Sequence, residues 1–394
     1  MKNRKLSYCC IISLGCCVSL LTSCKQPQSS SSSSSTLNIQ GESVNLSVDM
    51  GEEEQPVDLL KEGFADSVRY VPLETNDDVL ISSIEKIDVA DGFIYIHDAT
   101  KKIMKFDMSG KFVYAIDRVG LGPGEYSSIY DFCVRDGKVE VLDLENRRLL
   151  SYRASDGKFI RSIPLKSFFY HFMPIVGHHY LGDIHLYQKK KGMGVILLDS
   201  LTNEREKLLW YGMFPTLGEN INTFVALRGG SYGIFSQPDN TVYHYTYPDK
   251  LERAYTYQFN KGIPIPSLPG KESFQLSQEQ IEDLLTPCFY MEGKSFIWLS
   301  VIYGSRGYQV FYDKRTKKVS TSPAVFCSGM QCFHPLPTDT PHLVVCAVVS
   351  SILEAMKKAP KDKIPPEMQE NALYKMALQS KEESNPIVQL IYLK

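Results

Sequence analysis

The sequence has few of the features that mark disulfide frameworks, membrane spans or nucleic-acid binding. Five of its 10 cysteines lie in the first 24 residues, and the five that remain are an odd number, which excludes a complete disulfide framework. The leading apolar run, Ile11 to Leu21, is too short to cross a bilayer as a helix. The net charge is -2, and no basic stripe indicates a nucleic-acid partner.

Sequence motifs of metalloproteases, sialidases and zinc sites are also missing. The chain has no His-Glu-x-x-His and no repeated aspartate boxes of the sialidase type. Cys327, Cys332, His334, His342 and Cys346 have ligand chemistry but lack the short paired spacing of structural zinc sites. We therefore expect no metal and no cofactor. Paired carboxylates of a glycosidase can be recognised only from geometry, so that chemistry stays open.

What the sequence does contain is an internal repeat between Ile84 and Leu165. The segment IDVADGFIYIHD (Ile87–Asp98) matches FCVRDGKVEVLD (Phe132–Asp143), with a period of about 45 residues. Each copy has two turn signals between alternating segments, among them Asp91-Gly92 and Asp136-Gly137. A repeat of this length made of four short strands is typical of a β-propeller blade.

The rest of the chain extends this pattern to six blades. Strand and turn signals recur over about 176–211, 224–259 and 288–326, and a sixth blade begins near Met330. A strand at Ser67–Leu73 precedes the first blade and another at Pro386–Tyr392 ends the chain, as ring closure requires. We therefore predict an all-β fold over 37–394: a six-bladed propeller of four-stranded antiparallel blades.

A small helical insert interrupts the last predicted blade at about 350–380. Apolar residues at helical spacing, divided by prolines, predict helices at Ser350–Lys358 and Glu367–Ser380. Such a regular apolar stripe indicates packing rather than a ligand site.

The N-terminal residues read as a targeting signal followed by a tether. A basic start precedes the apolar run, which ends in Leu21-Thr22-Ser23-Cys24. These four residues resemble the bacterial lipobox, which implies a signal peptide at 1–24 and acylation of Cys24 that anchors the chain in a lipid membrane. The alternatives are an ordinary secretory signal and a buried apolar strand. Residues 25–36 are a serine-rich tether. The resemblance places the protein at the outer membrane, with a periplasmic orientation favoured over the cell surface.

Three further segments resemble the six-bladed propeller lipoproteins of gut Gram-negative bacteria, which are distant relatives of NHL-repeat propellers. They are Tyr70–Thr75, Gly120–Tyr126 and Asn385–Val388. The resemblance implies the fold and offers no catalytic residues.

The crossover Gly120–Tyr126 is the sharpest motif and defines the candidate site. It links the last strand of the first blade to the first strand of the second, so it must cross the top face, where propeller ligands most often bind. Glu125 there could hold the turn or present a carboxylate. The predicted binding rim consists of Arg118, Glu125, Tyr126, Arg147 and His171.

These observations favour a non-catalytic binding or scaffold module in nutrient uptake. Its ligand would be a glycan, a peptide or an envelope protein. The alternative is a hydrolase or lyase that acts on a polysaccharide or peptide in the channel. A carboxylate cluster at the channel would favour the enzyme.

Overall fold

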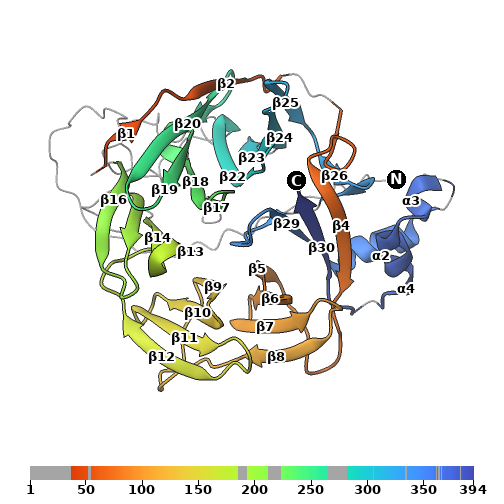
Figure 1. Cartoon of the computed structure of the whole chain (residues 1–394). Helices are drawn as coiled ribbons and strands as arrows, with labels where there is room; N and C mark the ends of the chain where they lie inside the picture. Colours follow the sequence, from red (N-terminus) through yellow and green to blue (C-terminus); the bar gives the residue numbers. More distant parts are fainter. Residues whose placement is uncertain are drawn as a thin grey trace. The chain divides into compact units, whose positions relative to one another are not determined.

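The computed structural model describes residues 37–51, 55–184, 193–211, 223–264, 282–304, 306–332, 335–360, 362, 364, 366–381 and 383–394. Nearly all regular structure in these residues is β-strand, arranged as sheets around a central axis (Figure 1). The predicted all-β propeller is therefore confirmed, and the predicted lipid-anchor residue Cys24 and the tether lie outside the described residues.

The two repeated blades have the expected antiparallel order. Their turns at Asp91-Gly92 and Asp136-Gly137 have positive φ at both residues (52° and 75°, then 51° and 67°), which matches the twist of the flanking strands. The blades consist of β5 (Ile84–Ala90), β6 (Phe93–Asp98), β7 (Lys102–Asp107) and β8 (Phe112–Ile116), then β9 (Asp131–Arg135), β10 (Lys138–Asp143), β11 (Arg148–Arg153) and β12 (Phe159–Pro164).

Three further blades follow in chain order. N-terminal strands β1 (Ile39–Gln40) and β2 (Val44–Val48) pair in parallel with the outermost strand of the second of them. The strands of these blades are β13 (His171–Ile175), β14 (His179–Ile184), β15 (Met193–Leu198) and β16 (Glu204–Tyr211); β17 (Phe224–Ala226), β18 (Ser231–Ser236), β19 (Thr241–Thr246) and β20 (Lys250–Phe259); and β21 (Ile263–Pro264), β22 (Leu284–Glu292), β23 (Phe296–Tyr303), β24 (Arg306–Asp313) and β25 (Lys318–Ser322).

The strand that precedes the first repeated blade and the last strand of the chain share one blade, as predicted. β4 (Ala65–Pro72) pairs antiparallel with β30 (Ile387–Leu393), with Val71 opposite Val388. β28 (Pro335–Leu336) and β29 (Leu343–Val348) complete this sheet. Pairing the first and last parts of the chain removes the free sheet edges that an open ring would leave.

The predicted count of six blades is wrong, because the propeller has seven. The additional sheet is the small one formed by β3 (Val57–Asp58), β26 (Val325–Cys327) and β27 (Met330–Gln331). Its strands are two or three residues long, and β3 pairs in parallel with β26 from the other end of the chain. Such short strands show no alternation, so the sequence pattern places β26 and β27 in neighbouring blades. Four of the seven sheets have four described strands, and the others have three, five and six.

The helical insert lies between β29 and β30. α2 (Ser350–Lys358) has the predicted bounds, whereas the second predicted helix is divided into α3 (Pro366–Gln369) and α4 (Ala372–Gln379). The division occurs because the Asn371 side chain caps α4 by accepting a hydrogen bond from the Leu373 N–H. The insert packs on the propeller, since the buried side chains of Leu353, Leu373 and Ala377 cluster with Val348 of β29 and Ile387 of β30. The residues that defined the predicted stripe are less buried: Ile352, Met356, Met368 and Met376 are half-buried and Ala372 is exposed. None of the helices in the described residues has the length and apolar character of a membrane span.

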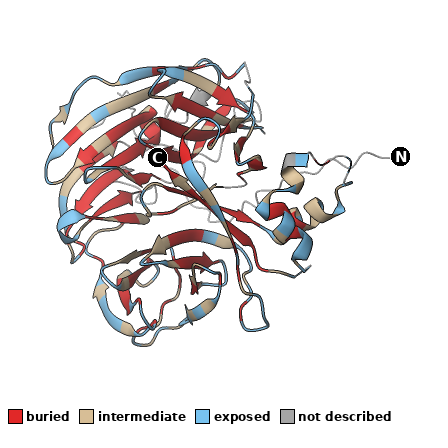
Figure 2. Ribbon diagram, turned by 45° about the vertical axis from the view of Figure 1, so that its right-hand side comes forward, coloured by how far each residue is buried: buried red, intermediate tan, exposed pale blue. Residues whose placement is uncertain are grey.

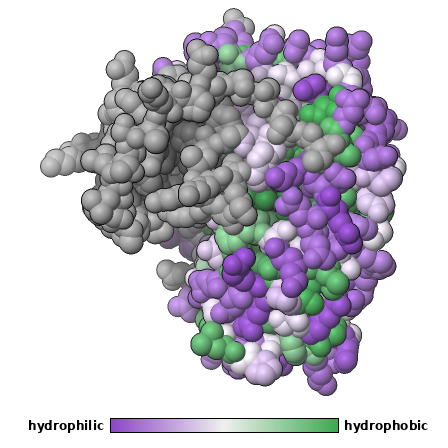
Figure 3. Space-filling model, turned by 90° about the vertical axis from the view of Figure 1, so that its left-hand side faces the viewer, coloured by the Kyte–Doolittle hydropathy of each residue, from purple (hydrophilic) through white to green (hydrophobic). Residues whose placement is uncertain are grey.

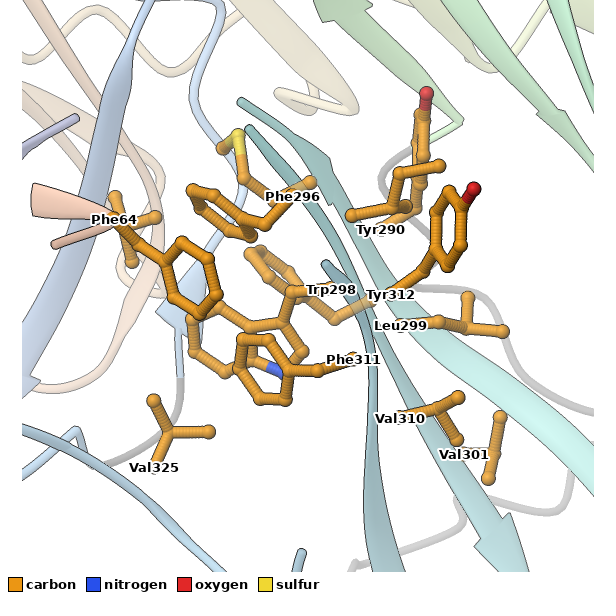
Figure 4. Packing of buried hydrophobic residues seen from close by; sticks show 14 of the residues in the cluster. Phe64, Tyr290, Phe296, Trp298, Leu299, Val301, Val310, Phe311, Tyr312 and Val325 are labelled. Carbon is orange, nitrogen blue, oxygen red and sulfur yellow. The ribbon is translucent and has the colours of Figure 1, made fainter. Parts of the chain in front are cut away.

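The core lies between neighbouring blades rather than inside any one of them. Buried residues lie mainly along the strands. The outer edges of the blades and the solvent-facing sides of the helices are more exposed (Figure 2). In the largest cluster, Trp298 stacks on Phe311 with ring centroids 5.5 Å apart, and Phe64 approaches Phe296 at 4.8 Å (Figure 4). Because Phe64 lies between β3 and β4, this contact joins the N-terminal segment to the β22–β25 blade.

Candidate functional site

The crossover Gly120–Tyr126 folds back on itself as a closed loop. The Gly120 N–H donates to the Tyr126 carbonyl, and the Tyr126 N–H donates to the Arg118 carbonyl, both at 2.9 Å. The Tyr126 side chain is fully buried, and its hydroxyl lies 2.8 Å from the Lys101 carbonyl oxygen and 2.9 Å from that of Ile116. Burial raises the pKa of Tyr126 to about 12. Tyr126 therefore anchors the loop from within the core, and the prediction that it lies on the rim is corrected.

Glu125 and the glycines of this loop serve its geometry. The half-buried Glu125 carboxylate accepts a 2.8 Å hydrogen bond from the Gly122 N–H. A Cβ atom at Gly120 would collide with that carboxylate. Gly124 has φ of 75°, and a Cβ there would lie 2.6 Å from Cγ of Phe159. Of the two roles considered for Glu125, the contacts show the turn-holding one.

The crossover is tied to the loops of the same face. Arg148 Nη2 donates to the Glu125 carbonyl at 2.6 Å, and Lys101 Nζ donates to the Ser127 carbonyl at 2.8 Å. Lys101 follows β6 and Arg148 begins β11, so the loops after β6 and β10 lie beside the crossover. Two buried repeat aspartates support this arrangement: Asp98 accepts hydrogen bonds from the Ser82 and Ser83 N–H groups, and Asp143 from the Ser127 N–H.

The remaining predicted rim residues have separate environments. Arg118 and Arg147 are exposed. His171, the first residue of β13, is half-buried, and its Nδ1 lies 4.0 Å from Asp183 Oδ2. The rim as a ligand-binding surface therefore stays a prediction, carried by Arg118, Arg147 and His171 with Glu125 holding the loop beside them.

A buried ionic cluster that the sequence patterns did not predict joins three parts of the chain. Lys86 Nζ lies 2.8 Å from Asp131 Oδ1 and 2.7 Å from Asp339 Oδ2. Lys86 is on β5 and Asp131 on β9, the first strands of neighbouring blades, while Asp339 follows β28. Asp88, also buried on β5, accepts a 2.7 Å hydrogen bond from the Asp339 N–H. We call these four residues the channel cluster.

Burial and mutual charge shift the pKa values of three residues in the channel cluster. Burial raises the pKa of Asp339 well above its usual range and that of Asp88 as well; the neighbouring carboxylates add to this effect, and the Lys86 ammonium opposes it. Burial alone would lower the pKa of Lys86, but the charges of Asp131, Asp339 and Asp88 raise it well above its usual range. The charged form of Lys86 and the neutral forms of Asp339 and Asp88 are thus favoured more than in isolated side chains.

The channel cluster is closed rather than open to a substrate. The side chains of Lys86, Asp131 and Asp339 are 9%, 4% and 15% exposed. The segment around Asp339 lies along β5, where the Ile87 N–H donates to the Pro337 carbonyl and the Val89 N–H to Thr340 Oγ1. In the part of the chain that the structure describes, no group of three or more His, Cys, Asp or Glu residues could hold a metal ion.

Only part of the channel cluster could have been predicted from the sequence. Lys86 and Asp88 alternate on one face of β5 in the repeat, and charged residues at such positions of a strand next to the core could have suggested buried partners. Asp339 is 253 positions from Lys86, and no local pattern connects them.

The residues Gly229–Gly233 match Gly-x-Ser-x-Gly, but their structure differs from that of a nucleophile elbow. In an elbow the serine lies on a sharp turn between a strand and a helix. Here the segment forms the hairpin between β17 and β18, and Ser231 is the first residue of β18. Its hydroxyl donates to the Arg228 carbonyl at 3.4 Å. The motif is therefore a turn signal at this position.

Comparison with known families identifies the family of this chain. Residues 43–392 match the model of a family described as a domain of unknown function (DUF4934). The chain belongs to this family. The match covers all seven sheets apart from β1 and the end of β30, so the family corresponds to the propeller itself.

One solved structure shares the fold, and a second is more distantly similar. A candidate exported protein of Bacteroides fragilis is 17% identical, with a TM-score of 0.70 over 89% of this chain and 100% of that one. A member of the DUF4221 family from Bacteroides vulgatus is 9% identical, with a TM-score of 0.48 over 84% of this chain and 97% of that one. No curated protein matches the chain.

Proposed function

We propose that this protein is an exported lipoprotein of the outer membrane, anchored through acylated Cys24, that acts as a non-catalytic binding or scaffold module. The leader and the serine-rich tether support export and anchoring. The description of the Bacteroides fragilis protein as a candidate exported protein supports export. A glycan, peptide or envelope protein is the ligand class, and a periplasmic orientation is favoured.

The closure of the channel cluster is the observation that supports a non-catalytic role. A hydrolase or lyase that works with two carboxyl groups must bring both within reach of the substrate. Here the carboxylates of Asp131 and Asp339 are already bonded to Lys86 and are almost wholly buried. The cluster instead ties together β5, β9 and the segment after β28, which is a structural role.

The exposed arginines beside the crossover support binding at the top face. Arg118 and Arg147 extend from a loop region that Glu125, Tyr126 and Arg148 hold in place. The left-hand side of Figure 1, which Figure 3 shows from the front, is a different side of the molecule: hydrophilic side chains dominate its described surface, and hydrophobic ones form only small groups there.

The anchor is tested by replacing Cys24 with Ala in cells fed a labelled fatty acid. We expect the Cys24→Ala chain to lose the label and to leave the membrane fraction. Cys17→Ala, a cysteine of the same segment outside the lipobox frame, should keep both. Retention of the label by Cys24→Ala would refute the anchor.

The binding role is tested by screening the full-length protein against glycan and peptide arrays. Substituting both Arg118 and Arg147 with Ala should abolish the strongest signals, while Lys158→Ala, an exposed cation in the turn between β11 and β12, should not. Signals that survive the double substitution would remove the rim from the proposal. Cleavage products released from either array would replace it with the hydrolase or lyase alternative.

A further inference from the structure

A cleft of about 220 Å³ opens between the β9–β12 blade and the β13–β16 blade. β10 runs from Lys138 at this cleft to Asp143 next to the loop that carries Arg147. The cleft therefore lies toward the opposite strand ends from the predicted rim, and it is a separate site.

Strand register explains why polar side chains gather there. Glu140 on β10 lies opposite Ser151 on β11, which lies opposite Arg161 on β12. Lys138 precedes Glu140 by two positions, so both side chains project from the same face of the sheet. That face packs toward β14, because the Tyr180 hydroxyl reaches Glu140.

The inner end of the cleft is a buried carboxylate with neutral partners. Glu140 is 4% exposed and accepts hydrogen bonds from the Tyr180 hydroxyl at 2.6 Å and the Ser151 hydroxyl at 3.4 Å. No cation in the described ranges lies within ion-pair distance of it. Arg135 lines the cleft but is directed away from Glu140. Its guanidinium lies 4.9 Å from the Tyr180 ring centre and donates to the Ile175 carbonyl at 2.8 Å.

The outer part of the cleft has an excess of positive charge. Asp136 already has one cationic partner, since Arg135 Nε lies 3.5 Å from its carboxylate, and the His178 ring Nδ1 lies at the same distance. Lys138, which is half-buried, and Arg161, which is exposed, have no ion pair or side-chain hydrogen bond with any residue that the structure describes. An anionic ligand would give both cations a partner through charge-assisted hydrogen bonds, which are the strong ones.

We propose that this cleft binds a small hydroxylated organic anion, such as an acidic monosaccharide. Its carboxylate or phosphate lies between Lys138 and Arg161, because both cations can only donate hydrogen bonds. One of its hydroxyl groups donates to Glu140, because an ionised carboxylate can only accept. The volume corresponds to roughly seven water molecules, which is enough for one sugar ring.

Calorimetric titration of the full-length protein in detergent tests the site with defined probes. We expect glucuronate or glucose 6-phosphate to bind and neutral glucose to bind at least about tenfold more weakly. Whichever of the two acids binds more tightly identifies the anionic group. Equal affinity for glucose, or no heat from either acid at millimolar concentration, would overturn the proposal.

Variants assign the roles of the individual residues. Lys138→Gln with Arg161→Gln should weaken glucuronate binding about tenfold or more, while Arg253→Gln, an exposed arginine on outermost strand β20, should leave it unchanged. Glu140→Gln keeps an acceptor for Tyr180 but should lose the preference for glucuronate over cyclohexanecarboxylate, which lacks hydroxyls. Unchanged binding in the double variant would refute the site.

Two controls separate loss of this site from loss of structure and from effects at the rim. Thermal unfolding of each variant shows whether lost binding reflects lost structure, and Arg161→Gln alone, at an exposed position, provides a folded test. The Arg118 and Arg147 substitutions of the rim should not alter glucuronate affinity. The proposal for the cleft and the proposal for the rim can therefore be refuted independently of each other.

Discussion

Asn385 and Glu74 are separated by 311 positions, yet Asn385 Nδ2 donates a 2.7 Å hydrogen bond to the Glu74 carbonyl. The same amide group donates to the Val79 carbonyl at 2.7 Å, and its Oδ1 accepts from the Ile81 N–H at 2.8 Å. Asn385 lies just before the last strand, β30, and Glu74 follows β4. The Asn385 side chain therefore joins the two chain segments that close the ring. Two of the three family-like segments, Tyr70–Thr75 and Asn385–Val388, thus meet at this closure.

Replacing Asn385 with Ala should lower the free energy of unfolding by about 2–4 kcal/mol, because it leaves buried backbone groups without partners. Urea unfolding measures the change. Asn45→Ala on β2 is the matched control: its side chain is exposed, so we expect a change within about 0.5 kcal/mol. Equal effects of the two substitutions would show that the hydrogen bonds of Asn385 do not contribute to stability.

Lys86→Met should destabilise the propeller by about 3–5 kcal/mol, because it leaves the buried carboxylates without their counter-charge. Asp339→Asn should cost much less, since the raised pKa of Asp339 means that a neutral side chain suits this position. Denaturant unfolding at neutral pH compares the two. A larger loss for Asp339→Asn than for Lys86→Met would contradict the assigned charges.

Acid should weaken the fold through His97. Burial lowers the pKa of His97 to about 4, against the opposing influence of Asp131 and Asp98. In the unfolded chain its pKa is about 6.5, so between these values the unfolded state binds a proton that the folded state does not. Stability therefore falls as the pH decreases from about 6.5 to 4, by about 3 kcal/mol in total at ~1.4 kcal/mol per unit.

Unfolding at pH 7 and at pH 4.5 measures this contribution. His97→Gln should lose about 2–3 kcal/mol less than the natural chain between these two pH values. An NMR titration in which the His97 imidazole protonates near pH 6.5 in the folded protein would disprove the assignment.

Gly124→Ala should destabilise the protein more than Gly229→Ala. Both glycines have positive φ, 75° and 82°, so each substitution costs about 1 kcal/mol in backbone strain. Only at Gly124 does the new methyl group also meet another atom, since Phe159 lies 2.6 Å from its position, whereas Gly229 has nothing within 4 Å. Thermal unfolding distinguishes them, and similar losses would mean that Phe159 can move aside.

Local chemistry explains which features could be predicted from the sequence. The hairpins at Asp91-Gly92 and Asp136-Gly137 follow from residues that tolerate positive φ, and α2 follows from apolar spacing. The two end strands could be paired because a ring needs closure, and β4 and β30 do pair. The crossover Gly120–Tyr126 was recognisable because its glycines permit a tight loop.

The tertiary structure alone decided what depends on distant partners. The seventh sheet pairs β3 with β26, and its strands are too short to show a pattern. Lys86 meets Asp339 only because the segment after β28 lies along β5. Whether Tyr126 points to solvent or into the core depended on the carbonyls of Lys101 and Ile116. The sequence by itself determined the repeat and its turns, because these are set by conformation within a few residues. The blade count and the charged cluster required contacts across hundreds of positions, which no local preference encodes.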